Sequence, residues 1–463
     1  MITAATALAE LYREVTGEPL ASGSVRVVGD DPVLPGLFRV GALAAASVGA
    51  TTAAAAALLT DRGDDPGAVS VNTRHAAIAF RSQSYLRVDG QSGGGEWAPL
   101  SGDYRAADGW VKLHCNYPHH ARAAARALDV PADRDAVAAA VAGRRAVEVE
   151  EAVVAAGGAA AAMRTRNVWR SHPQGQASRS IPLVALETLD GNVSRRPLPR
   201  GEAPLSGVRV LDLTHVIAGP VCGRVLAAHG ADVLHVGAAH LPTIRPLLID
   251  TGFGKRSCHL DLRERAGQET LRALVREADV LVQSYRPGAL AGYGFGPESL
   301  AELRPGLIVA TLSAWGHAGP WRRRRGFDSL AQLATGIADE GARAAGSDRP
   351  HPLPAQALDH ASGWLTAFGV LTALRRRAAV GGTWRVRVAL ARTAAWLDDL
   401  DRLRPDAIQA GLPGVADIAD LLADTSSQFG RITHVRMPGD LPAAPPSWRD
   451  GPHLPGSDPA EWW

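Results

Sequence analysis

GVRVLDLTHVIAGPVCGRVLAAHGADVLHV, residues 207–236, decides the fold that we predict for this chain. Two apolar runs, VRVLDL and ADVLHV, flank a loop that leads into a helix ending near Gly230. Further apolar runs follow at 279–285 and 307–313, with helices expected at 264–277 and 297–303 between them. Short apolar runs separated by helices are typical of βαβ units and a parallel sheet. The sequence therefore predicts an α/β protein.

Three loops lie where such a sheet binds its ligands. Ligands of parallel sheets gather at the carboxyl ends of the strands, which correspond here to residues 214–220, 284–288 and 313–320. The first strand is followed neither by G-x-G-x-x-G nor by a P-loop lysine, so an NAD or ATP site loses support. The run Trp321-Arg322-Arg323-Arg324-Arg325 is either a solvated loop or a phosphate clamp.

Composition narrows the classes of function. The 463 residues carry 49 basic and 47 acidic side chains, a net charge of +2, so a nucleic-acid partner is not indicated. The three cysteines are few and far apart, which favours reduced thiols in a cytoplasm. The N-terminus does not read as a signal peptide, and the alanine-rich run 42–59 favours a close-packed core helix over a membrane span.

Residues 101–200 are expected to form a compact α+β unit. A β-hairpin turning at Asp108-Gly109 comes first, followed by helices at 119–128, 133–142 and 147–156. His114, His119 and His120 fit no zinc spacing with the cysteine between them, so we expect surface or structural histidines and no metal. Before this unit, the glycines at 93–95 form either a linker or a loop whose N–H groups approach a ligand.

LPAQALDHASGWLTAFGVLTAL, residues 353–374, carries a single carboxylate where a proline-bounded loop meets an apolar helix. On physical grounds Asp359 is a good N-cap, because its oxygen can accept hydrogen bonds from the first turn. Residues 34–77 repeat the layout of residues 353–395, yet Leu43 stands in the place of Asp359. If Asp359 were only a helix cap, the first repeat could carry an aspartate at the same place. Because it does not, the difference between the repeats favours a special role for Asp359.

From residue 204 to about 400 the chain resembles class III CoA-transferases of the CaiB/BaiF family. The resemblance rests on residues 204–236, GKRSCHLDL, ADVLVQSYRPGALAGYGFGPESL, RPGLIVATLSAWGHAGP, GFDSLAQLATG and the Asp359 helix. Residues 91–200 resemble the family's smaller domain, which in typical members follows the Asp helix. The resemblance therefore implies a rearranged member: a Rossmann-like parallel-sheet large domain with long linker helices, plus a smaller α+β domain.

The expected domains follow from this resemblance and from the repeat. They are a leader helix and connection (1–35), a linker-helix module without the Asp (36–90), the small α+β domain (91–203), the Rossmann-like CoA-binding domain (204–345), the catalytic Asp helix module (346–400) and a C-terminal tail (401–463).

The resemblance implies that Asp359 attacks an acyl-CoA thioester and passes through a mixed anhydride and an aspartyl-CoA thioester. Such a carboxylate needs no metal, cofactor or base, because it is already ionised at neutral pH, and CoA enters only as a thioester substrate. In relatives a glycine-rich loop stands near this aspartate, a role that falls on Gly93, Gly94 and Gly95. The CoA-binding positions are His215, Val216, Ile217, Ala218, Ser284, Tyr285, Arg286, Arg325 and Phe327.

The expected partners are acyl-CoA and carboxylate small molecules, in a homodimer without nucleic acid or membrane. Two departures from the family pattern keep a non-catalytic CoA-binding or scaffold paralogue open. The run His235-Val236-Gly237-Ala238-Ala239 replaces a charged segment, and Ser284 replaces a CoA-contacting Asn. A 2-methylacyl-CoA racemase is less favoured, because Phe327 precedes Asp328 where racemases carry a histidine base.

Overall fold

The computed structural model describes residues 2–93 and 97–463, and seven strands form its largest sheet. In spatial order they are β11 (Lys255–His259), β10 (Asp232–Gly237), β9 (Arg209–Leu213), β12 (Val280–Gln283), β13 (Ile308–Ser313), β14 (Thr383–Ala389) and β8 (Ala185–Asp190). All neighbouring strands are parallel except β8, which pairs antiparallel with β14. The first six follow the Rossmann order, with the topological switch point between β9 and β12. The predicted α/β fold with a parallel sheet is confirmed.

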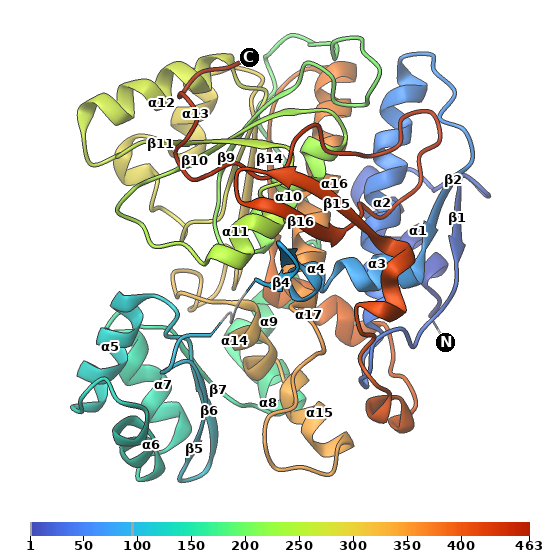
Figure 1. Ribbon diagram of the computed structural model, residues 1–463. Helices are drawn as coiled ribbons and strands as arrows, with labels where there is room; N and C mark the ends of the chain where they lie inside the picture. The colour runs from blue at the N-terminus through green and yellow to red at the C-terminus, as the bar shows by residue number, and fades with distance from the viewer. Residues whose placement is uncertain (1, 94–96) are drawn as a thin grey trace.

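Helices cover both faces of this sheet (Figure 1). On one face Val210, Val282 and Val386 join the main core with α10 (Ala218–Ala228) and α16 (Ala357–Val380). On the other face Leu211 and Leu281 pack with α12 (Arg265–Glu277) and α13 (Pro297–Leu303). Both faces are buried because the strands are apolar at successive positions, not only at alternate ones.

The N-terminal segment repeats the strand–helix–strand plan of residues 308–399. Strands β1 (Val25–Val28) and β2 (Val69–Asn72) are parallel, flank α2 (Val40–Asp61) and lead into α3 (Thr73–Ala79), just as β13 and β14 flank α16 and lead into α17 (Leu390–Asp399). Helices α2 and α16 contact each other directly, and the Thr51 hydroxyl donates a 3.0 Å hydrogen bond to the Trp364 carbonyl. Among the described residues, α2 is the one helix that is long and apolar enough to cross a membrane. Of its most apolar 18-residue stretch, 94% is buried within the protein.

The small unit lies apart from the large sheet, at the lower left of Figure 1. It contains β5 (Gly102–Ala106), β6 (Gly109–Leu113), β7 (Ala160–Ala162), α5 (Pro118–Leu128), α6 (Arg134–Ala142) and α7 (Ala146–Ala155) around its own core. The predicted hairpin forms, but Ala106 pairs with Gly109, so the turn is Ala107-Asp108, one residue earlier than predicted. The Asp108 carboxylate fixes this turn by accepting a 2.8 Å hydrogen bond from the Ala146 backbone N–H.

The small unit ends earlier than the expected boundary at residue 203. Strand β8 belongs to the large sheet, because Glu187 on β8 forms ion pairs with Arg385 and Arg387 on β14. The two helices that precede β8 also leave the small unit: α9 contacts α17, and α8 contacts α15. Their bounds, with those of α15, are α8 (Arg166–Ser171), α9 (Pro173–Ser180) and α15 (Ile337–Ala344).

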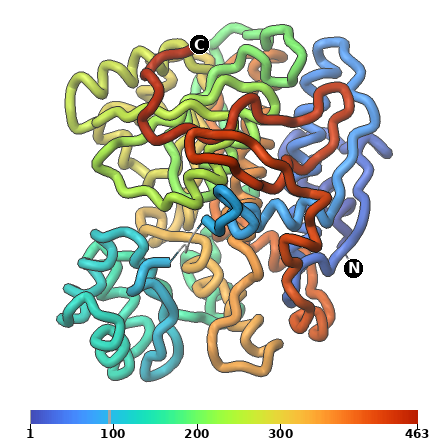
Figure 2. Tube along the Cα trace, in the orientation of Figure 1, coloured from blue at the N-terminus to red at the C-terminus, as the bar shows by residue number. Residues whose placement is uncertain are grey.

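The C-terminal tail contacts both the N-terminal module and the large domain. Strands β15 (Leu422–Ser427) and β16 (Gly430–Val435) form a sheet with β3 (Arg87–Val88) and β4 (Gln91–Ser92). The tail then crosses the large domain (Figure 2), where the Trp448 indole donates to the Arg224 carbonyl at 3.0 Å. The remaining elements are α1 (Ala4–Thr16), α4 (Ser82–Tyr85), α11 (Arg245–Thr251), η1 (Ala291–Tyr293), α14 (Asp328–Ala334), η2 (Pro405–Gln409) and η3 (Ala416–Leu421).

Candidate active site

A cavity of about 460 Å³, which we call the main cavity, lies at the carboxyl ends of β9, β12 and β13. Its volume lies within the range of about 300–1,000 Å³ that is usual for small-molecule sites. Ten residues predicted from the sequence line it together: His215, Val216, Ile217, Ala218, Ser284, Tyr285, Arg286, Arg325, Phe327 and Asp359. The fold thus brings four separate segments of the chain to one cavity beside the switch point.

Asp359 does not cap its own helix. It is the third residue of α16, whose N-cap is Gln356. The cap comes from another segment, because the Asp328 Oδ2 accepts a 2.9 Å hydrogen bond from the Asp359 backbone N–H. Asp328 also hydrogen-bonds the side chain of Gln332, whose Oε1 accepts a 2.7 Å bond from the Leu353 backbone N–H. The Asp359 carboxyl is therefore left to face the main cavity.

The two carboxyl groups affect each other's protonation. Burial and the charge of Asp328 raise the pKa of Asp359 well above its usual value. Burial also raises the pKa of Asp328, to about 6. We expected Asp359 to be already ionised at neutral pH, but desolvation and a neighbouring carboxylate both disfavour its anion. The partial positive charge at the N-terminus of α16 has the opposite effect and stabilises the Asp359 anion.

His360, the next residue, is turned away from the main cavity. Its Nε2 lies 3.1 Å from the Gln83 Oε1, and its ring stacks on Phe80 with centroids 5.4 Å apart. Burial holds the pKa of His360 well below its usual value, so the imidazole is neutral. This histidine fastens α16 to the N-terminal module and is not placed to act as a base for Asp359.

A buried ion pair between Lys255 and Asp212, which we call the floor of the main cavity, supports the loop 214–220. The Lys255 Nζ lies 2.7 Å from the Asp212 Oδ2 and donates a second 2.7 Å hydrogen bond to the Pro220 carbonyl. The Thr214 hydroxyl donates to the other Asp212 oxygen. Within this loop Val216 has a φ of +74°, an uncommon conformation for a β-branched residue and one that concentrates at functional sites.

Lys255 also lines the main cavity, and sequence reasoning gave it no role. A signal was present, because Lys255 is one of two lysines in a chain that otherwise uses arginine for its basic residues. Lysine is a compact point charge that can sit beneath a loop, whereas the planar arginine fork needs more room.

The small unit supplies an aromatic wall that the sequence did not reveal. Tyr117, His119 and His120 line the main cavity. His114 stacks on Phe327 with centroids 3.5 Å apart and rings 1° from parallel, which joins the two units. Burial and His119 lower the pKa of His120 to about 3, so its imidazole is neutral. The prediction of structural histidines suits His114, but His119 and His120 belong to the cavity.

The arginine run divides between two roles. Arg325 lines the main cavity, and its guanidinium donates a 2.7 Å hydrogen bond to the Gly157 carbonyl. Burial and the nearby Arg286 lower the pKa of Arg325. Arg324 instead pairs with Glu150 at 3.0 Å and Glu151 at 2.7 Å on the small unit. Arg286 and Arg325 therefore give the main cavity two guanidinium groups, which match phosphate oxygens.

The glycine loop is described only at its first residue. Gly93 packs near Pro246 of α11, where an added Cβ would lie 3.1 Å from the Pro246 Cβ. Other residues of α11 line the main cavity, whereas Gly93 does not. Gly94 and Gly95 lie outside the described residues. In the described part of the chain, no three His, Cys, Asp or Glu side chains gather closely enough to hold a metal ion.

Curated relatives match about two fifths of the chain. It is 34% identical over 198 residues to acetyl-coenzyme A transferase nodX of Hypoxylon pulicicidum, covering 42% of this chain and 33% of that protein. It is 36% identical over 208 residues to a probable fatty acyl-CoA transferase of Mycobacterium tuberculosis, covering 42% of this chain and 52% of that one. It is also 36% identical over 198 residues to formyl-CoA:oxalate CoA-transferase of Rhodopseudomonas palustris, covering 40% and 46%.

Among solved structures, a CaiB/BaiF family protein from Brucella suis is similar at 29% identity, with 42% of this chain and 55% of that chain covered and a TM-score of 0.37. The chain spans between about a third and about half of the length of these curated relatives. Residues 205–405, which include Asp359 and the nine other predicted residues of the main cavity, match the family model described as CoA-transferase family III. Over these residues the chain is similar to CoA-transferase family III.

Proposed function

We propose that this protein moves CoA from an acyl-CoA to a carboxylic acid acceptor, with Asp359 as the nucleophile. One observation carries the proposal: the Asp359 carboxyl lines a cavity at the switch point of a Rossmann-type sheet and shares it with Arg286 and Arg325. A carboxylate suits the thioester end of an acyl-CoA, and guanidinium groups suit its phosphate end.

The proposed reaction needs no group beyond the carboxylate and its two substrates. An Asp359 oxygen attacks the thioester carbonyl, the C–S bond breaks, and CoA leaves as a thiolate from a mixed anhydride. The thiolate then attacks the aspartyl carbonyl and releases the donor acid, which leaves an aspartyl-CoA thioester. The acceptor carboxylate attacks this thioester to form a second anhydride. Attack of the thiolate on the acceptor carbonyl gives the new acyl-CoA and frees Asp359.

The raised pKa of Asp359 has a chemical use in this scheme. A carboxylate that is held in a buried, poorly solvated position is more basic than one in water, and a more basic oxygen is a stronger nucleophile once it is ionised. The N-terminus of α16 supplies partial positive charge that stabilises the attacking anion. Transfer should therefore be limited at low pH by the ionisation of Asp359.

The same proposal includes three features that are expected from the family resemblance. By their place in the sequence, Gly93, Gly94 and Gly95 match the family's glycine-rich loop, and a loop of that kind can stabilise an oxyanion through its backbone N–H groups. The protein assembles as a homodimer and works in the cytoplasm. Its substrates are small acyl-CoA and carboxylate molecules.

Trapping with hydroxylamine tests the proposal directly. Incubation with a panel of acyl-CoA donors and hydroxylamine should convert Asp359 into a hydroxamate, which peptide mass analysis can locate. Asp359→Ala should remove both the adduct and the exchange of CoA between acids. Asp135→Asn is a matched control, because Asp135 also lies in the first turn of a helix but is exposed on α6. Absence of an adduct across the panel would contradict the proposal.

The two alternatives predict different outcomes in the same preparation. A non-catalytic CoA-binding protein would bind CoA in a calorimeter and give neither an adduct nor exchange. A racemase would incorporate solvent deuterium at the α-carbon of a 2-methylacyl-CoA. The racemase is disfavoured because Phe327 stands before Asp328 where racemases carry a histidine base, and because the neighbouring His120, with a pKa of about 3, is a weak base.

A further inference from the structure

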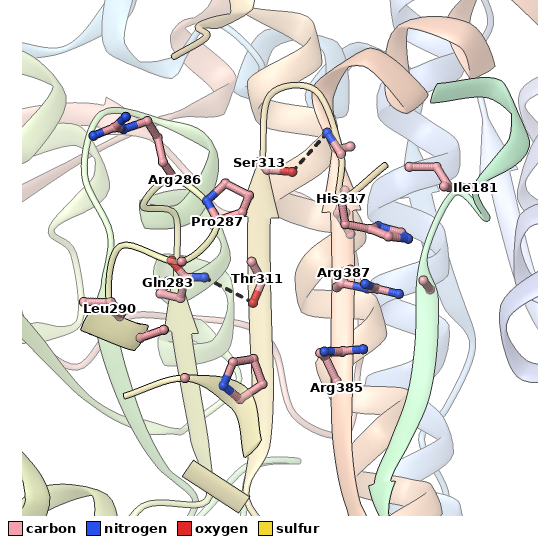
Figure 3. Close-up of a pocket in the computed structure, with 18 of the residues that line it drawn as sticks. Ile181, Gln283, Arg286, Pro287, Leu290, Thr311, Ser313, His317, Arg385 and Arg387 are labelled. Carbon is pink, nitrogen blue, oxygen red and sulfur yellow. Dashed lines mark hydrogen bonds between the residues drawn. The ribbon is translucent and has the colours of Figure 1, made fainter. Parts of the chain in front are cut away.

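A second cavity, of about 160 Å³, lies beside the main cavity at the carboxyl ends of β12, β13 and β14, and we call it the strand-end cavity (Figure 3). Its volume is below the usual range for a whole small-molecule ligand, so it suits a single ionic group. Residues 286 and 313 line both cavities, which makes the loop after β12 the partition between them. Arg286 turns its guanidinium away from Arg385 and Arg387 in this view.

A polar row crosses the sheet at this point. Gln283, Thr311 and Arg387 are neighbours on β12, β13 and β14 by strand register, so their side chains share one face of the sheet. One step earlier on β12 and β13 the same face carries Leu281 and Val309 in an apolar core. The Gln283 amide donates a 3.2 Å hydrogen bond to the Thr311 hydroxyl, whose own O–H can still be donated to a ligand.

Among the described residues, three arginines and no acidic residue line the strand-end cavity, and two glutamates beside it pair with Arg385 or Arg387. Arg385 and Arg387 follow each other along β14, and His317 lies above them (Figure 3). Glu187 pairs with both arginines, while Glu298 lies 3.7 Å from Arg385 and its side chain is 76% exposed.

The Arg387 guanidinium also has a donor to spare. Its Nε is buried and has no hydrogen-bond partner among the described residues. A buried donor without a partner costs free energy, so the hydrogen-bonding capacity of Arg387 is not fully used within the described residues. Burial and Arg385 lower the pKa of His317, so this ring adds polarity without charge.

We propose that the strand-end cavity binds a phosphate group through Arg387 and Thr311. The group is either the phosphate end of CoA or a free phosphate, and the first source rests on the proposed function. An acceptor carboxylate is a poorer occupant, because it must reach Asp359, which does not line this cavity. In CoA, by contrast, the phosphates lie at the opposite end of a long molecule from the reacting thiol. A CoA molecule whose thioester lies in the main cavity can therefore extend past the shared loop.

Binding measurements on the full chain test this site without any turnover. The dissociation constants of CoA, 3′-dephospho-CoA and inorganic phosphate are measured by calorimetry for the wild type and for Arg387→Met, which keeps much of the side-chain length and removes the charge. If CoA is the source, the wild type should prefer CoA over 3′-dephospho-CoA by about tenfold, and the variant should lose this preference. If free phosphate is the source, Arg387→Met should lose phosphate binding. The ratio of its dissociation constants for CoA and 3′-dephospho-CoA should equal that of the wild type.

Two further variants guard against a folding artefact. Thr311→Val leaves the ion pairs of Arg387 intact and should still weaken the same binding by several-fold. Arg323→Met, a change at an exposed arginine that lines neither cavity, should behave as the wild type. Unchanged phosphate affinity and unchanged CoA preference in both Arg387→Met and Thr311→Val would overturn the proposal. Failure of the CoA-transferase proposal would appear instead as the absence of the Asp359 hydroxamate.

Discussion

The backbone N–H of Asp359 donates a 2.9 Å hydrogen bond to the carboxylate of Asp328, so two buried acids meet at the first turn of α16. Asp328 thereby has two opposite effects on its neighbour. As an acceptor it fixes the turn that presents Asp359, and as an anion it opposes the ionisation of Asp359. These effects can be separated, because asparagine retains an acceptor oxygen and carries no charge.

The first prediction concerns Asp328→Asn and the pH dependence of transfer. Since the charge of Asp328 raises the pKa of Asp359, its removal should lower that pKa and move the acid limb of kcat/KM to lower pH. Initial rates between about pH 5 and pH 9 measure the shift. Asp135→Asn should leave the limb in place. An unchanged limb in Asp328→Asn would mean that the two carboxyls are not coupled in solution.

The second prediction is that Asp359→Asn gains stability at pH 8 while it loses transfer. Both carboxyls have raised pKa values when folded, so their contribution to stability is present below the unfolded pKa near 4 and is lost as pH rises through the folded pKa, about 6 for Asp328. At pH 8 the two ionised carboxylates therefore lower the stability of the folded protein, and the uncharged amide in Asp359→Asn removes this loss. Calorimetric Tm values should show an increase at pH 8 that shrinks toward pH 5.

The loss of transfer in Asp359→Asn should reach about four orders of magnitude, as is usual when a covalent nucleophile is removed. A Tm at pH 8 below that of the wild type would contradict the assignment of Asp359 as a strained, buried anion. Asp135→Asn, measured beside it, should change neither Tm nor rate.

The third prediction concerns the floor of the main cavity. Lys255→Met should destabilise the protein by about 3–5 kcal/mol, because it leaves the fully buried Asp212 charge without its partner. Adding Asp212→Asn should recover part of this loss. Lys112→Met is the matched control, since its partner Asp103 stays reachable by water, and it should cost less. Chemical denaturation provides the three free energies of unfolding, and equal losses for both lysines would contradict the prediction.

The fourth prediction is that Gly363→Ala disturbs the site through helix packing. A Cβ at Gly363 would lie 2.5 Å from the Ala218 carbonyl oxygen, so α10 and α16 could not keep their present approach. Because Ala218 and Asp359 both line the main cavity, we expect lower stability, by about 1–3 kcal/mol, together with lower transfer activity. Gly143→Ala, where nothing lies within 4 Å of the added Cβ, should leave both unchanged.

Local sequence patterns predicted the elements and the edge of the sheet at which the cavity lies. The helix expected over residues 297–303 is α13 with the same bounds. The loops after β9 and β12 were placed at the strand ends from the apolar runs alone, and they meet at the main cavity. This part was predictable because it depends on periodicity within short windows and on one rule about parallel sheets.

Features that depend on distant contacts were missed. Asp328, and not Asp359, caps the first turn of α16, although the two residues lie 31 positions apart in the sequence. In the sequence alone, either aspartate is a plausible cap. His120 reads as a surface histidine until the small unit docks on Phe327. The raised pKa of Asp359 required knowledge of its burial, which no neighbouring residue in the sequence indicates.

The N-terminal repeat has a consequence for how the site responds to dilution. Helix α16 packs against α2 of the same chain, so this contact is unimolecular and does not depend on the amount of protein. A helix covered by another molecule would lose that support as the protein is diluted below the dissociation constant. Here the packing of α2 on α16 does not depend on protein concentration.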